Sequence, residues 1–196
     1  MAITRANLLS EAYEVYIGDT DADVPEVDDN SDGTLIIDGT DFVQVYTEGP
    51  VKLDYEAEMT GVKVNGFLSE IKKVLIGESA KIGFSIAEED LSMFNYAISA
   101  STLSAVAAGS SQAAQDVLTI GDGSIVEKQL VLVGKSPEGG FRAVIIPIAV
   151  CTGSFSKETQ VEHTPIPVEF EVLGDTSASA GSRLMTIYDW TAAPTA

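Results

Sequence analysis

The sequence predicts a mainly β protein, a β-sandwich or open barrel with one flanking α-helix. Apolar and polar residues alternate in many short runs that are separated by glycine and proline, which is the pattern of strands joined by turns. Only one segment, about residues 87–99, places apolar residues at helical spacing. Many strands with a single helix are typical of a sandwich or open barrel.

The helix belongs to the most informative segment, Glu78–Ile98, where a strand leads straight into it. The apolar residues of that strand share one face: Ile82, Phe84 and Ile86. The residues expected to pack the helix onto the sheet are Leu91, Phe94 and Ile98. Glu88, Glu89 and Asp90 precede them, and negative charge is favourable at a helix N-terminus. We therefore interpret these three carboxylates as capping charges.

The longest regular alternation follows Gly49-Pro50. Its apolar members are Val51, Leu53, Tyr55, Ala57 and Met59, and its polar members are Lys52, Asp54, Glu56, Glu58 and Thr60. A period of two over ten residues predicts a strand with one buried and one solvated face. The segment Val62–Ile76 is expected to return or extend it.

Other strands are predicted at 11–17, 35–37, 41–46, 128–133, 141–150, 153–157, 166–173 and 184–188. Phe141–Val150 is almost continuously apolar, which predicts a central strand. Pro165 and Pro167 cannot donate ladder hydrogen bonds, so the strand there should start at an edge.

Four segments lack a clear strand or helix pattern. They are an N-terminal arm at about 1–10, an acidic loop at 18–33, a Ser/Ala-rich loop at 99–115 and a C-terminal tail at 189–196. We find no internal repeat or linker, so one domain over 1–196 is expected.

Composition narrows the classes of function. The chain has 11 Lys and Arg against 30 Asp and Glu, a formal net charge of −19, which disfavours tight binding of nucleic acid. Such a surface either confers solubility or keeps DNA nearby without holding it. No apolar run is long enough to suggest a membrane span, and the N-terminus does not resemble a secretion signal. The single cysteine excludes an internal disulfide, and we expect folding in a cytoplasm.

Catalytic chemistry has little support, and we expect no enzyme and no cofactor. His163, the single histidine, has no accompanying nucleophile motif, and Cys151 follows an apolar strand as a small buried residue would. Asp28, Asn30 and Asp32 match the first half of a calcium-binding loop. Gly39 occupies the place of the closing glutamate, so a solvated loop is favoured over an ion site.

Three segments, with the order of strands between them, carry a resemblance to a protein family. They are Thr47–Leu53 at the entry to the long strand, Gly77–Leu91 leading from strand to helix, and Gly181–Asp189 near the end. Together they resemble the major tail proteins of phages with long non-contractile tails, which build the tail tube. The resemblance covers roughly residues 10–190 and depends on pattern more than on one motif.

The resemblance implies a structural virion protein that forms stacked hexameric rings around a channel for DNA during ejection. Its implied partners are further copies of itself, the tape-measure protein, the tail terminator and distal tail proteins, with no membrane. The implied location is the virion tail, assembled in the host cytoplasm. For the channel lining we expect the polar face of the 51–60 strand: Asp54, Glu56 and Glu58. For contacts between rings we expect the N-terminal arm, the acidic loop and the C-terminal tail.

Two other hypotheses of function stay open. A tube subunit of a contractile injection or secretion machine would share this fold, and sequence separates the two poorly. A calcium- or carbohydrate-binding β-sandwich module would need an ion loop or a platform of exposed aromatic residues. Trp190 and six scattered tyrosines form no such platform in the sequence.

Overall fold

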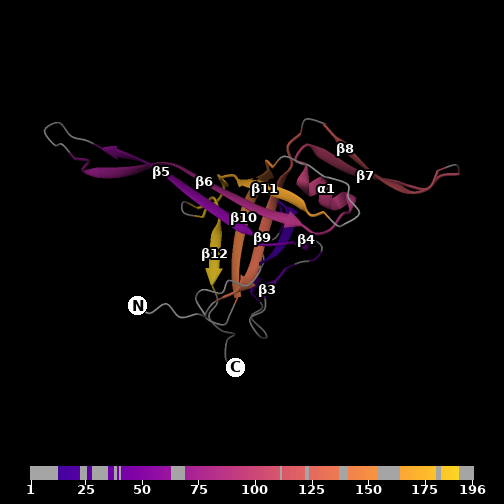
Figure 1. Ribbon diagram of the computed structural model, residues 1–196, viewed down its shortest axis with the longest axis horizontal. Helices are drawn as coiled ribbons and strands as arrows, with labels where there is room; N and C mark the ends of the chain where they lie inside the picture. The colour runs from indigo at the N-terminus through magenta and orange to yellow at the C-terminus, as the bar shows by residue number, and fades with distance from the viewer. Residues whose placement is uncertain are drawn as a thin grey trace, which may run out of the picture.

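The computed structural model describes residues 13–22, 26–27, 35–37, 39, 41–62, 69–110, 112–121, 124–136, 141–153, 164–179 and 182–189 (Figure 1). Its strands are β1 (Glu14–Asp19), β2 (Glu26–Val27), β3 (Leu35–Ile36), β4 (Phe42–Val45), β5 (Lys52–Val62), β6 (Lys72–Ile86), β7 (Ser101–Val106), β8 (Gln115–Ile120), β9 (Glu127–Lys135), β10 (Phe141–Cys151), β11 (Ile166–Val172) and β12 (Thr186–Asp189). The helix in this part of the chain is α1 (Leu91–Ala97). The protein is therefore mainly β, as predicted. No helix in the described ranges is long and apolar enough to cross a membrane.

One antiparallel sheet organises the body, with strand order β4-β1-β9-β10-β11-β6-β5. β10 lies in its middle, which confirms the prediction for Phe141–Val150. Its register with β9 shifts between Ile146 and Ala149. Before the shift, residues 142–145 pair with β12, and after it, residues 149–151 pair with β11. β10 thus changes partners part of the way along its length.

The chain after β4 joins the far side of this sheet. The Glu48 amide donates to the Ser85 carbonyl at 2.8 Å, and the Ala87 amide donates to the Tyr46 carbonyl at 2.8 Å. β4 itself pairs with β1, whereas Ser85 and Ala87 lie at and just beyond the end of β6. Backbone hydrogen bonds therefore connect the two sides of the strand order through residues 46–48.

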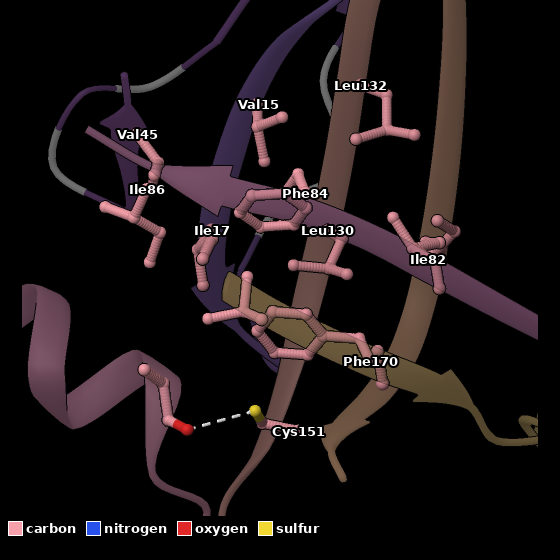
Figure 2. Close-up of a cluster of buried hydrophobic side chains, with 14 of the residues drawn as sticks. Val15, Ile17, Val45, Ile82, Phe84, Ile86, Leu130, Leu132, Cys151 and Phe170 are labelled. Carbon is pink, nitrogen blue, oxygen red and sulfur yellow. Dashed lines mark hydrogen bonds between the residues drawn. The ribbon is translucent and has the colours of Figure 1, made fainter. Parts of the chain in front are cut away.

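The main core lies between β6 and β11 on one side and β1, β9 and β10 on the other (Figure 2). Ile82, Phe84 and Ile86 are buried in it, which confirms the face predicted for that strand. The Phe84 and Phe170 rings stack with centroids 5.8 Å apart. A smaller cluster of Phe42, Val131 and Ile145 forms separately. β9 and β10 contribute to both clusters, which explains the apolar run Leu130–Val133 in β9 and the almost continuously apolar sequence of β10.

Two hairpins leave the body on opposite sides, β5–β6 on the left of Figure 1 and β7–β8 on the right. The return of the long strand is confirmed, because β5 and β6 pair from Lys52 with Gly83 out to Val62 with Lys72. The prediction of one buried face for residues 51–60 is wrong. Most of β5 is exposed on both faces, since the hairpin extends past the body and no described layer covers it.

The prediction of a Ser/Ala-rich loop at 99–115 is also wrong, because part of this segment forms strands. β7 pairs with β8 in register from Ser101 with Ile120 to Val106 with Gln115. Weak periodicity hid these strands, because both faces of the hairpin are largely exposed and neither needs an apolar stripe. Likewise, the acidic loop at 18–33 includes the end of β1 and the short strand β2, which pairs with β3.

The helix is shorter than the expected 87–99. Asp90 is its N-cap, and the Asp90 carboxylate accepts a hydrogen bond from the Met93 amide at 2.8 Å. Glu88 and Glu89 precede the helix, so Asp90 alone of the three expected capping charges has the cap position.

Its buried residues also differ from the prediction. They are Met93 and Ala97, while Leu91 is 38% exposed. Phe94 does pack against the core, and Ile98 is half-buried at the C-cap. The buried face is therefore centred on Met93 and Ala97, with Phe94 and Ile98 beside it.

β11, the strand that contains Pro167, lies inside the sheet order, yet its first residues lie at an edge on the β10 side, as predicted. Pro167 pairs with Ser85 of β6, and the pairing of β11 with β10 begins only at Phe170. Among the described residues, the proline therefore faces no β10 partner and interrupts no ladder there. The N-terminal arm at 1–10, His163, Trp190 and the tail beyond 189 lie outside the described residues, as does most of the strand predicted at 153–157.

Candidate assembly surfaces

The three residues predicted to line a channel share one face of β5, as their alternation requires. The register places Asp54 opposite Lys81, Glu56 opposite Ser79 and Glu58 opposite Gly77. Lys81 in turn lies opposite Glu171 of β11. Residues directly opposite one another in antiparallel strands point to the same face, so these acids form one surface. We call it the acidic face: Lys52, Asp54, Glu56, Glu58, Lys81, Glu169 and Glu171.

Both lysines of the acidic face are paired. Lys52 Nζ lies 2.5 Å from Asp54 Oδ2, and Lys81 Nζ lies 3.0 Å from Glu169 Oε1. The hydrogen bond to Glu169 raises the pKa of Lys81, so this lysine stays charged. Five carboxylates against two ammonium groups leave the face negative. These pairs are solvent-exposed, so they orient side chains more than they stabilise the fold.

A shallow concavity lies on the acidic face between β5 and β6. Its lining includes Glu56, Glu58 and Ser79, with Glu78 and Gly77 beside them. Gly77 has the Glu58 carboxylate 3.4 Å from where a Cβ would stand. The described residues contain no group of three or more His, Cys, Asp or Glu side chains arranged to hold a metal ion. The concavity therefore offers charge but no coordination site.

The other face of the same hairpin is mainly apolar, although Glu78 opposite Ala57 and Lys73 opposite Gly61 also lie on it. Beyond the body it carries Tyr55, Ala57, Met59 and Leu75, and the apolar side chains Ile76 and Val74 are also exposed nearby. Met59 is 58% exposed and Ile76 is 56% exposed. Tyr55 Oη donates to Glu78 Oε1 at 2.6 Å, and this hydrogen bond raises the pKa of the tyrosine. We call the distal part of the hairpin, residues 55–62 and 69–78, the first arm.

Exposed apolar side chains also occur on the β7–β8 hairpin, which we call the second arm (residues 101–106 and 115–120). Leu103, Val106 and Ile120 are exposed there. Ser101 anchors its base, because Ser101 Oγ donates to the Ile98 carbonyl at 2.6 Å just after α1. The second arm is thus fixed to the helix at its base and projects from the body (Figure 1).

The remaining titratable groups with shifted pKa values are scattered and structural. Burial and a hydrogen bond to Glu14 raise the pKa of Tyr16 to about 12. Burial raises the pKa of the Cys151 thiol, which donates to the Ala97 carbonyl at 3.2 Å (Figure 2). Cys151 is 4% exposed, which confirms its predicted role as a small buried residue. Asp28, Asn30 and Asp32 lie outside the described residues.

Sequence reasoning found the acids of β5 but missed their partners and both arms. Lys81, Glu169 and Glu171 come from strands distant in sequence, so only the register of the sheet brings them to Asp54. The first arm was missed because an alternating strand is usually half-buried, and β5 is not. The length of β5, 11 residues, and of β6, 15 residues, was the available signal, since the mode for strands is about 5–6.

A comparison with models of protein families and a comparison with curated proteins each gave no match.

Proposed function

We propose that this chain is the structural subunit of a hollow phage tail tube, built from stacked hexameric rings, through which DNA passes during ejection. The observation that carries the proposal is the exposed first arm. A two-stranded hairpin is marginally stable in water unless another layer packs on it. The first arm nonetheless extends from the body with Met59, Leu75 and Ile76 in solvent. An assembled neighbour would bury this surface.

The edges of the sheet support the same proposal. In the described residues β5 pairs only with β6, so its outer edge presents unsatisfied backbone groups. An exposed edge of 11 residues is an aggregation hazard unless it is used. In a closed ring of identical subunits, pairing between neighbours consumes such edges.

We further infer that the sheet curls into a sandwich or open barrel with α1 on its flank. Two features support this inference. The core lies between β6 and β11 on one side and β1 and β9 on the other. The bonds from Glu48 to Ser85 and from Ala87 to Tyr46 draw the two sides of the strand order together.

The acidic face supplies the channel lining in this proposal. Glu56, Glu58 and Glu171 would repel the phosphate backbone, so DNA would slide without being held. Location in the virion tail after assembly in the host cytoplasm follows, as do contacts with a tape-measure protein, a tail terminator and distal tail proteins.

The direct test is negative-stain electron microscopy of the purified protein at high concentration. Rings or hollow tubes of uniform width are expected. A stable monomer that binds calcium or a glycan would overturn the proposal in favour of a binding module. A tube subunit of a contractile injection or secretion machine would also form rings. Purification of native particles separates this alternative, because a contractile machine carries a sheath around the tube.

The channel assignment has its own test. Asp54→Lys, Glu56→Lys and Glu58→Lys are combined in one variant, and its tubes are mixed with short duplex DNA at low salt. Tubes of the variant should retain DNA, whereas wild-type tubes should not. Equal retention by both would place the acidic face outside the channel while leaving the tube itself intact. In virions, normal DNA ejection by the variant would contradict the assignment as well.

A further inference from the structure

We propose that the second arm of one copy docks along the first arm of the next copy, in a head-to-tail contact. This inference rests on the proposed function, and it names the two surfaces through which neighbouring subunits meet. Neither arm was predicted as an exposed hairpin from sequence. The contact joins different surfaces, so it is heterologous and can repeat without limit or close into a ring.

The placement of the arms gives the first argument. Figure 1 shows the two arms projecting from opposite sides of the body along the longest axis of the molecule. A copy displaced along this axis brings its second arm next to the first arm of its neighbour. Two arms on the same side would instead favour a closed two-fold pair.

Composition of the second arm gives the second argument. From Ser99 to Gly121 the chain has one charged residue, Asp116, although the whole protein has a formal charge of −19. Two copies of so acidic a protein repel one another wherever their charged surfaces meet. A nearly uncharged hairpin can approach a second copy without that cost. Burial of its exposed apolar residues Leu103 and Ile120 would contribute favourable free energy to the contact.

The first arm complements the second. Its outer end carries Lys72 and Lys73, which alternate between the two faces of β6, and a single carboxylate, Glu70, so the excess of negative charge found elsewhere on the chain is absent there. The Glu70 carboxylate lies over Gly61, where a Cβ would stand within 2.1 Å of it. Met59 and Leu75 are exposed beside the outer edge of β5, which pairs with no further strand among the described residues, so an incoming strand could contact both. An uncharged hairpin with a lone aspartate fits this surface better than a second copy of the same arm would.

A mixing experiment tests the contact. Met59→Glu blocks the first arm and Ile120→Glu blocks the second; these side chains are 58% and 60% exposed, so neither change should disturb folding. Each variant alone should lose the oligomers that the wild type forms, as measured by size-exclusion chromatography with light scattering. Their equimolar mixture should recover dimers and nothing larger, because each mixed pair has one intact junction. Val43→Glu, on β4 at 41% exposure, is the matched control and should assemble like the wild type.

Cross-linking provides a second, independent measurement. Cys151 is buried, so Met59→Cys and Ile120→Cys introduce the reactive thiols. A short bismaleimide should link the two variants when mixed, and neither variant to itself. Absence of this mixed product would overturn the proposal, as would unimpaired assembly of Met59→Glu or Ile120→Glu. Self-linking of Ile120→Cys would indicate that second arms pair with one another instead.

The outcomes also separate this contact from the tube proposal. Tubes that persist in both glutamate variants would refute the arm contact and leave the tube standing. Arm-dependent dimers or open filaments, without hollow tubes from the wild type, would support the contact and refute the tube.

Discussion

Replacing Phe170 with alanine should destabilise the folded monomer by about 3–5 kcal/mol. Phe170 is 1% exposed and belongs to the layer of β11 that closes the main core. Truncation removes a fully buried ring and leaves a cavity that the paired strands around it can fill only in part. Since small domains are stable by about 5–15 kcal/mol, the variant should fold but unfold at much lower urea. Equilibrium unfolding followed by circular dichroism at low protein concentration measures the change.

The stacked partner makes this prediction sharper. Phe84 lies with its ring 5.8 Å from that of Phe170 and nearly parallel to it. Such pairs contribute about 0.5–1.5 kcal/mol beyond area burial. The double variant with Phe84→Ala should therefore cost less than the sum of the two single changes, by about that amount. Tyr55→Ala, on the exposed first arm, is the control and should change monomer stability little. A loss below about 1.5 kcal/mol for Phe170→Ala would refute the assignment of this ring to a closed core.

Three further predictions concern the cap, the thiol and a close packing contact. Asp90→Ala should cost about 0.5–2 kcal/mol, measured by urea unfolding, because it removes the acceptor for the Met93 amide. Hydrogen bonds from Ser92 and Met93 hold the pKa of Asp90 below its usual range. The stabilisation is thus present above the unfolded pKa of about 4 and is lost as pH falls through the lower folded pKa. The penalty of Asp90→Ala should therefore shrink in acid. Cys151 should react with a thiol reagent only on unfolding, because burial raises its pKa and blocks access; rapid native labelling would contradict this. Gly134→Ala should destabilise, since a Cβ there would stand 2.9 Å from the Tyr13 ring, whereas Gly109→Ala, with open space around it, should be nearly neutral in the same thermal melt.

The sequence predicts best those elements whose pattern follows from burial. Ile82, Phe84 and Ile86 alternate because one side of β6 faces the core. β10 is apolar at almost every position because residues on both of its faces are buried. In both cases the burial of side chains determines the local order of apolar and polar residues, so the order predicts the strand.

Prediction failed where tertiary context decides exposure. β5 alternates as a half-buried strand does, yet its apolar residues Tyr55 and Met59 meet solvent, because the hairpin runs beyond the body. Local pattern carries no information on where the neighbouring layer ends. The Ser/Ala-rich segment failed for the opposite reason, since β7 has two wet faces and therefore no stripe to recognise. The acidic face was found in part, because Asp54 and Glu58 share a strand while Lys81 and Glu169 arrive through pairing distant in sequence.

The change of partners along β10 has a consequence for the order in which the fold is completed. Residues 142–145 of β10 can complete their pairing only with β12, which is synthesised after the other described strands of the sheet. Until Thr186–Asp189 arrive, that stretch of β10 has an open edge on which another chain could pair. Arg142 then bonds to Asp189 and holds the late strand in register, and this hydrogen bond lowers the pKa of the aspartate. Pairing of β12 thus covers the last open part of the β10 edge, and after this step another chain can no longer pair with it.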